Sequence, residues 1–371
     1  MERTVLRAGL AVLSAAILTV LLGCPPAGQG PYTPPVSGTP VVYAGGFSEN
    51  KGVSVPGYWQ DGTWVGLSPL YATQNAQVNS IYVSAGTVYS GGWAMDSGSH
   101  QVPGYWAGDT WTPLSQTNTS ASSSVNALVV SGGYVYAGGS NADANGNPSG
   151  GYWANGKWTS VTPPSGDSQC VVTSIEVSGG TVYSGGYCLG GKSFVPVYWT
   201  GQTPTPLSEL SSNAASEVLA IVVSGGQVYP AGYSNDAVNG DVAGDWPSGK
   251  WASLLPSKAT VGEVYGIAAS GGSLYASGWS NPTGSNIPGT WVNGTWSALS
   301  LPTNGAGTST SALSIFVHGS DVYVGGYSED TKAVLEIPGY WLNGAWVSLP
   351  TLSSDSTLGF YSQVSSIFVS P

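Results

Sequence analysis

Few side chains in this sequence could carry out catalysis or hold a metal ion. The chain has two histidines, His100 and His318, and no arginine after Arg7. None of its many serines has a base beside it in a recognisable catalytic motif. We therefore expect no enzyme activity, no metal site and no cofactor. Carboxylates that folding brings together are the remaining route to catalysis, and they would favour a hydrolase or a lyase.

The charge of the chain excludes some partners. Eight Lys and Arg residues against 19 Asp and Glu residues give a formal net charge of −11, and no run of basic residues occurs. Nucleic acids and anionic membrane surfaces are bound through clusters of Lys and Arg. We expect no nucleic-acid partner, and we expect that any partner is not strongly acidic.

The first cysteine, Cys24, lies at the end of a segment with the features of an export signal. Arg3 and Arg7 precede the mostly apolar run Ala8–Leu22, which is shorter than the roughly 20 residues that span a bilayer. The run ends in Leu21-Leu22-Gly23-Cys24, which resembles the lipobox of bacterial lipoproteins. The resemblance implies cleavage before Cys24 and lipidation of that cysteine. An ordinary cleaved signal and an uncleaved anchor are the alternatives.

Residues 24–40 connect the expected signal peptide, residues 1–23, to the rest of the chain. Pro and Gly are too dense there to pack a core, and Pro favours extended polyproline II segments. We expect a tether that holds a domain at residues 41–371 away from a membrane. The expected location is the bacterial cell envelope, outside the cytoplasm, at the outer membrane or the cell surface.

The chain from Val41 onward consists of repeats. A V/L-Y-x-G/A/S-G pattern recurs every 46 to 48 residues, and a later Trp, usually within Gly-Tyr-Trp, recurs with it. The two columns are Tyr43, Tyr89, Tyr136, Tyr183, Tyr229, Tyr275 and Tyr323, and Trp59, Trp106, Trp153, Trp199, Trp246, Trp291 and Trp341. A second Trp follows five residues after the first in all copies except the fourth. Units of four short strands with this period are typical of β-propeller blades.

The two ends of the repeat region complement each other. The first unit begins directly at Val41 and lacks a first strand, whereas the chain ends in a first strand, Val364–Ser370, that no unit follows. We therefore predict an all-β fold, a seven-bladed β-propeller of four-stranded blades, closed by the C-terminal strand joining blade one. An open solenoid is the alternative, but it would need distinct capping repeats.

One unit shows a family resemblance. Gly91-Gly92, followed by Tyr105 and by Trp111 six residues later, resembles a kelch-type blade, and the resemblance extends over Val41–Pro371. The Gly-Tyr-Trp cluster departs from the usual kelch pattern. The resemblance implies the propeller fold and no particular function.

Loop length distinguishes two faces of the predicted propeller. We label the strands of each blade a, b, c and d. Pairs such as Asn155-Gly156 between strands c and d favour tight type I′ turns, and Gly-Gly pairs make tight a–b turns. The b–c and d–a loops are longer and lie on the opposite face. We call these the turn face and the loop face, and we expect function at the loop face.

Aromatic residues mark that face. An aromatic side chain follows the strand-b glycines in six units, and Ser140 is the exception. The six are Phe47, Trp93, Tyr187, Tyr233, Trp279 and Tyr327. They either pack or contact a ligand, whereas the Trp columns are expected to pack between blades. We expect a monomeric protein-binding scaffold with an envelope or extracellular protein as partner. A lectin that binds glycan through these rings is the alternative.

Cys170 and Cys188 flank the predicted turn at Gly179-Gly180. Residues that face each other across this hairpin have numbers that sum to about 359, and these two sum to 358. Export from the cytoplasm would favour oxidation. We predict a disulfide between Cys170 and Cys188, with two buried free thiols as the alternative.

The lipoprotein hypothesis is tested by metabolic labelling with a palmitate analogue. The wild-type protein should be labelled, and the Cys24→Ala variant should not, because the acceptor thiol is gone. Equal labelling of the two proteins would contradict the hypothesis.

Overall fold

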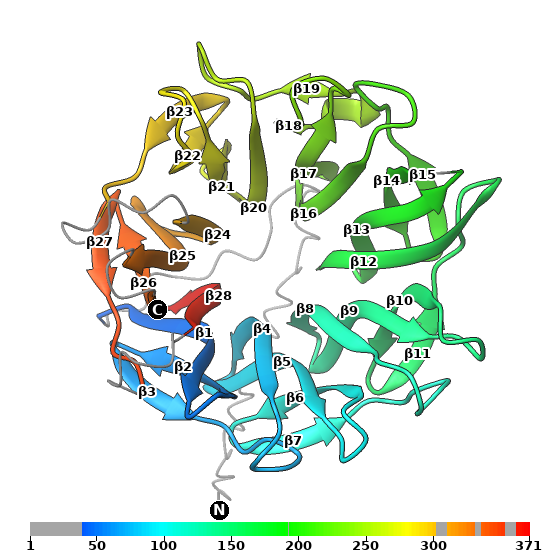
Figure 1. The fold of residues 1–371 in the computed structure, drawn as a ribbon, viewed down its shortest axis with the longest axis vertical. Helices are drawn as coiled ribbons and strands as arrows, with labels where there is room; N and C mark the ends of the chain where they lie inside the picture. The colour runs from blue at the N-terminus through cyan, green and yellow to red at the C-terminus, as the bar shows by residue number, and fades with distance from the viewer. Residues whose placement is uncertain (1–38, 192, 302–309, 331–334, 353–360) are drawn as a thin grey trace, which may run out of the picture. The chain divides into compact units, whose positions relative to one another are not determined.

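Seven antiparallel sheets, each of four strands, surround a central axis (Figure 1). The computed structural model describes residues 39–371 except 192, 302–309, 331–334 and 353–360. The expected signal peptide, Cys24 and nearly all of the tether lie outside the described residues. The seven sheets confirm the predicted all-β propeller with seven four-stranded blades.

The strands follow the order of the repeats. Blade one contains β28 (Ser362–Ser370), β1 (Val41–Asn50), β2 (Val53–Gln60) and β3 (Thr63–Gly66), and blade two contains β4 (Ala76–Ser84), β5 (Thr87–Met95), β6 (Gln101–Ala107) and β7 (Thr110–Pro113). Blade three contains β8 (Ser124–Ser131), β9 (Tyr134–Ala142), β10 (Pro148–Ala154) and β11 (Lys157–Ser160), and blade four contains β12 (Asp167–Ser178), β13 (Thr181–Gly190), β14 (Ser193–Thr200) and β15 (Thr203–Pro206). Blade five contains β16 (Ser216–Ser224), β17 (Gln227–Asn235), β18 (Asp241–Asp245) and β19 (Ala252–Ser253), and blade six contains β20 (Gly262–Ser270), β21 (Ser273–Ser280), β22 (Ile287–Val292) and β23 (Thr295–Ala298). Blade seven contains β24 (Ser311–His318), β25 (Asp321–Asp330), β26 (Leu335–Leu342) and β27 (Ala345–Ser348).

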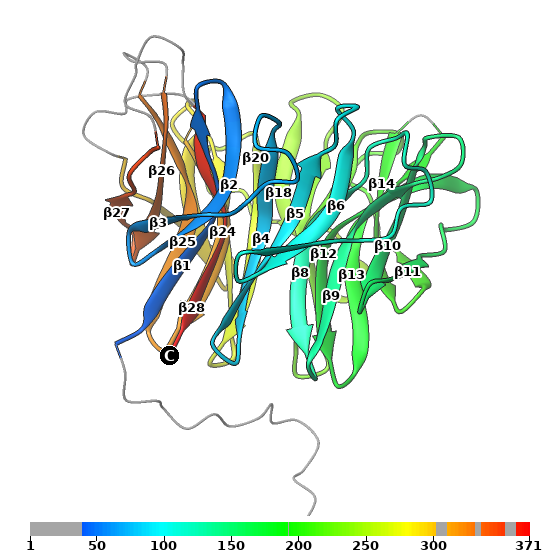
Figure 2. The ribbon, with the colours of Figure 1, turned by 90° about the horizontal axis from the view of Figure 1, so that it is seen from below.

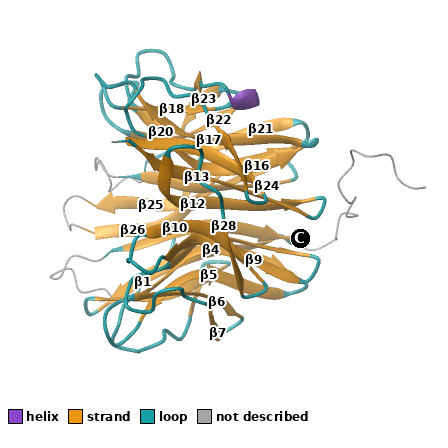
Figure 3. Ribbon diagram, turned by 90° about the vertical axis from the view of Figure 1, so that its right-hand side faces the viewer, coloured by secondary structure: helices purple, strands orange, loops and turns teal. Residues whose placement is uncertain are grey.

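One short helix interrupts this pattern. The 3₁₀ helix η1 (Pro247–Gly249) connects strands c and d of blade five, where the other blades have tight turns (Figure 3). Within the described part of the chain, no helix has the length and apolar character needed to cross a membrane.

The C-terminal strand closes the ring. β28 pairs antiparallel with β1, so that Val41 lies opposite Ser370 and Ala44 opposite Ile367. In Figure 1 the two strands lie side by side although they come from opposite ends of the chain. This pairing confirms the predicted closure and leaves blade one with the same four strands as its neighbours.

A bulge in strand a explains the recurring Gly-Gly pair. In blade two, Val78 pairs with Gly92 and Ser80 with Gly91, so Asn79 between them is unpaired. A Cβ atom on Gly92 would collide with the backbone carbonyl oxygen of Gln77. The second position is glycine in all seven blades and meets the same obstacle in each, whereas the first is Ala231 in blade five and Ser277 in blade six.

The Trp column holds neighbouring blades together. Trp106 is 0% exposed, and its indole Nε1 donates a hydrogen bond of 2.8 Å to the carbonyl of Ser68 in the preceding blade. The second Trp of the blade, Trp111, packs on it with ring centroids 4.3 Å apart. The first Trp is 0–1% exposed in every blade and makes the corresponding bond. The prediction that this column packs, and does not stack on sugars, is confirmed.

The turns lie on the face where the chain enters and leaves the propeller. Asn155 and Gly156 have φ angles of 47° and 81°, which confirms the predicted type I′ turn. β1 begins and β28 ends on this turn face, and the long b–c and d–a loops lie on the other (Figure 2).

Closure can be tested by deletion and circular permutation. Deletion of Ser362–Pro371 removes strand a of blade one and should cause unfolding or aggregation. The same strand should restore stability when it is moved ahead of Val41 and joined through Gly-Gly, because Ser370 and Val41 are already paired as residues that flank a two-residue turn. Thermal unfolding measures both effects. A deletion variant as stable as the wild type would contradict the closure.

Candidate functional site

The six aromatic residues of the sequence prediction lie one residue beyond the Gly-Gly pair, toward the loop face. Trp93, for example, sits opposite Gln77 of strand a and Pro103 of strand c. All six side chains are half-buried. These side chains are therefore neither fully buried in the core nor fully available to stack on a ligand. Their possible roles depend on the residues that they contact.

Those partners are polar in blades five to seven. The hydroxyl of Tyr233 donates a hydrogen bond to the carboxylate of Glu217. In blade six, the Trp279 Nε1 donates to the hydroxyl oxygen of Tyr265 over 3.2 Å, and Tyr265 is hydrogen-bonded to Glu263. In blade four, by contrast, Tyr187 packs on Phe194 with ring centroids 4.7 Å apart.

Carboxylates gather around these rings. We call Glu217, Asp241 and Glu263 the acidic arc of blades five and six. Burial raises the pKa of the Glu263 carboxyl to about 7, and the charges of Asp241 and Glu217 add to the shift. Burial also raises the pKa of Glu217, with a further contribution from Asp241. The carboxylates of the arc therefore disfavour one another's ionised forms, and none of the described cations is paired with them.

Blade seven repeats this situation. Glu329 and Glu336 are paired across β25 and β26. Burial, together with the neighbouring Glu329 charge, raises the pKa of the Glu336 carboxyl to about 7. Apart from His100 with Asp96, the described residues contain no ion pair, so none of the described cations is paired with either group.

Carboxylates outnumber lysines among the described residues of the loop face. Its described carboxylates are Glu49, Asp96, Asp143, Asp167, Glu209, Glu217, Asp236, Asp241, Glu263, Glu329 and Glu336. The described lysines on this face are Lys51 and Lys258, in the connections that follow β1 and β19. Potential of one sign over a whole face attracts partners of the opposite charge.

Exposed apolar side chains also concentrate on the loop face. Ten large hydrophobic residues are exposed among those described, and all but Tyr134 and Val292 belong to this face. The loop-face members are Leu70, Tyr71, Phe194, Leu210, Val238, Leu301, Leu352 and Tyr361. Leu70, Leu210 and Leu352 occupy the same repeat position, three residues after the buried leucine that directly follows strand d.

A central cavity of about 600 Å³ runs between the innermost strands. Its walls include the unpaired bulge residues of the seven strands a, which are Asn79, Asn126, Thr173, Leu219, Tyr265, Leu313 and Ser365. Tyr265 therefore links the cavity to the acidic arc. Glu176 is the one carboxylate of the lining; it accepts a bond from the Val223 amide at 2.9 Å, and burial raises its pKa.

The histidines lie on opposite faces, as the order of the strands predicts. His100 is in a loop-face connection, with Nδ1 3.4 Å from Asp96 Oδ2, whereas His318 ends β24 at the turn face. Among the described residues, no group of three or more His, Cys, Asp or Glu side chains could hold a metal ion.

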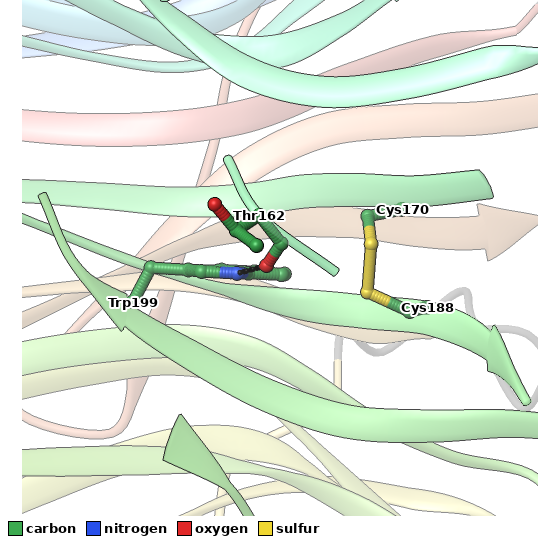
Figure 4. The surroundings of a disulfide bond; sticks show 4 residues. All are labelled: Thr162, Cys170, Cys188 and Trp199. Atoms are coloured by element: carbon green, nitrogen blue, oxygen red, sulfur yellow. Dashed lines mark hydrogen bonds between the residues drawn. A yellow bond between two sulfur atoms is a disulfide. The ribbon is translucent and has the colours of Figure 1, made fainter. Parts of the chain in front are cut away.

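Cys170 and Cys188 form a disulfide between β12 and β13, with their Cα atoms 3.9 Å apart (Figure 4). The bulge at Thr173 shifts the strand register by one residue, so that facing residue numbers sum to 358 beyond it. Both cysteines are buried in a cluster with Val172, Val197 and Trp199. The disulfide thus lies in the core of blade four, near the Trp199 indole that donates to the Thr162 carbonyl (Figure 4).

The acidic arc and the exposed leucines were not predicted from the sequence. The signal for the arc was the column of strand-a residues opposite the strand-b aromatics, which contains Gln77, Glu217, Glu263 and Gln363. Polar residues recur there although the next residue is Val in each of these four strands. The leucines were visible as a column, but their exposure depends on the path of the d–a loops.

The raised pKa of Glu263 leads to a prediction about stability. Its pKa is about 7 in the folded protein against a reference value of 4.5, so between these values the folded state binds more protons than the unfolded state. The contribution of Glu263 to stability therefore falls as the pH rises from about 4.5 to 7. Glu263→Gln removes this cost and should stabilise the protein at pH 8 by on the order of 2 kcal/mol, with little effect at pH 4.5. Urea denaturation at the two pH values measures this, and an equal effect at both would contradict it.

Comparisons with known proteins leave the family open. No family model matches the chain, and no curated protein matches it. Solved structures do match, and one of them is described as "YCF48 bound to D1 peptide". The match is 12% identical, covers 76% of this chain and 85% of the other, and has a TM-score of 0.44. At this identity and TM-score, the likeness carries no statement about the activity or the partner of the present chain. The kelch resemblance likewise stays an expectation.

Proposed function

We propose that this protein is an interaction scaffold that binds a partner protein through its loop face. The observation that carries the proposal is the segregation of exposed apolar side chains. Tyr71 and Leu70 belong to the eight that lie on the loop face, whereas the turn face has Tyr134 and Val292. Exposed apolar and aromatic side chains with a polar rim are characteristic of surfaces that bind proteins. A rigid ring of blades holds the loops that carry them.

The charge of the loop face indicates the chemistry of the partner. Among the residues that the structure describes, the half-buried carboxylates of the acidic arc and of the Glu329–Glu336 pair form no ion pair. A partner segment with Lys or Arg beside apolar residues would supply both the missing charge and the contacts for the exposed leucines. No catalytic role is part of the proposal.

The point where the tether joins the propeller supports an orientation. β1 begins at Val41 on the turn face, so a lipid anchor at Cys24 would attach to the propeller on that side. The 16 residues between Cys24 and Val41 span up to about 50 Å in polyproline II conformation, at about 3.1 Å per residue. In the proposed envelope lipoprotein, the loop face then points away from the membrane and toward its partner.

The proposal predicts face-specific cross-linking. A photoreactive phenylalanine analogue at Tyr71 should cross-link a defined envelope protein, because Tyr71 is 46% exposed on the loop face. The same analogue at Tyr134, which is 53% exposed on the turn face, is the matched control and should not capture that protein. Tyr71→Ser should then weaken binding of the purified partner by roughly tenfold, and Tyr134→Ser should not.

Two outcomes would contradict the proposal. Equal cross-linking from both positions would mean that the loop face has no special role. Glycan binding on an array that disappears in the Trp93→Ala and Trp279→Ala double variant, without a protein partner, would favour the lectin alternative.

A further inference from the structure

A second pocket lies between blades five and six. It has a volume of about 240 Å³ and is separate from the loop-face residues described above. Leu254, Ile267, Tyr275 and Trp291 form mostly apolar walls, and Asp245 carries the only carboxyl group of the lining. Other lining residues, Asn293 and Gly294, belong to the exposed c–d turn of blade six, so the pocket reaches the turn face.

The pocket exists because blade five departs from the repeat. In five blades the residue before the buried Trp of strand c is Tyr, and a Gly of strand b faces it. These tyrosines fill space between blades; Tyr105, for example, packs against a buried cluster that contains Val125 and Trp153 of the next blade. In blade five the pair is Asp245 with Ala231. Because an aspartate is much shorter than a tyrosine, the space beside it is left open.

The carboxyl group in this pocket has few partners. Burial raises the pKa of Asp245 to about 6, and its own backbone amide is the hydrogen-bond donor that opposes the shift. None of the cationic side chains that the structure describes forms an ion pair with it. Near pH 7.5 Asp245 therefore carries a charge that faces apolar walls, and such a charge favours a cation within the same pocket.

We propose that this pocket binds a small protonated primary amine that carries an aromatic or aliphatic group. The ammonium group would pair with the Asp245 carboxylate, and the body would lie against Ile267 and Trp291. Size supports this class, since an apolar cavity of about 150 Å³ already accommodates benzene. The larger volume here, about 240 Å³, leaves room for a short aminoalkyl arm.

The test uses the full mature chain with benzylamine and phenethylamine as probes. Titration calorimetry should give saturable binding of both amines at one site at pH 7.5, and benzyl alcohol, of similar shape but neutral, should bind at least tenfold more weakly. Asp245→Asn keeps the shape of the side chain and removes the charge, so it should weaken amine binding at least tenfold. Asp109→Asn, at an exposed c–d turn, is the control and should bind like the wild type.

A second variant separates loss of the site from loss of the fold. Ala231→Gly with Asp245→Tyr restores the Gly–Tyr pair of the other blades and fills the pocket. This variant should abolish amine binding and keep or raise the melting temperature. The proposal is overturned if Asp245→Asn binds the amines as the wild type does, if benzyl alcohol binds equally well, or if no amine binds at concentrations up to about 10 mM.

Discussion

The contact that the rest of this structure depends on is the hydrogen bond from a buried indole to the carbonyl of the preceding blade. A blade is a thin sheet that cannot cover its own faces, so its stability depends on the neighbours. The indole fills the space between two sheets, and its N–H finds a partner where water is excluded. The bond from Trp59 to the Pro350 carbonyl, at 2.8 Å, makes the same contact across the point of closure. Because every interface is of this kind, none can be left open without exposing two large apolar faces.

The bulge in strand a has a second consequence for function. It brings the backbone of strand a so close to strand b that only glycine fits, as at Gly92. The extra residue has no ladder partner and lines the central cavity. Its identity is therefore free of the pairing that constrains its neighbours, and it varies from Asn79 to Leu219 to Tyr265. In blade six the residue at this bulge is Tyr265, whose hydroxyl is hydrogen-bonded to both Trp279 and Glu263.

The parts of the fold that were predictable from sequence are those that repeat. The Tyr and Trp columns each have seven members, and this number gives the number of blades. Asn155-Gly156 identifies the c–d turn of blade three, because both central residues of a type I′ turn have positive φ. The facing of Cys170 and Cys188 follows from the turn at Gly179-Gly180, with an offset of one that the bulge explains.

The candidate site was less predictable because it depends on differences between blades. Glu217 and Asp241 are brought together by the strands of blade five, and their repulsion with Glu263 exists only after blades five and six pack. Asp245 could be read from the sequence as a departure from Gly-Tyr-Trp. Its meaning required the observation that tyrosine at this position fills the space between blades. The departures of a repeat protein from its own pattern are therefore where its particular chemistry has to be sought.

Blades five and six show how far the packing between blades can change while the ring persists. In most other blades a Ser of strand a is paired with a Gly of strand b; in blade six the order is reversed, with Gly266 in strand a and Ser277 in strand b. A Cβ atom on Gly266 would lie 2.7 Å from the Ser277 hydroxyl. The total side-chain volume of the pair is therefore unchanged. The Ala231–Asp245 pair keeps less volume than Gly–Tyr. A sealed, empty cavity of the resulting size would cost roughly 6 kcal/mol, which is comparable to the net stability of a domain. The pocket reaches the exposed turn at Asn293 and carries a carboxylate, so water or a ligand can occupy it, and the Trp291 bond to the Leu254 carbonyl, at 2.6 Å, still holds the two blades together. The ring thus keeps its indole contacts although the interface of blades five and six lacks the tyrosine that fills this space in five other blades.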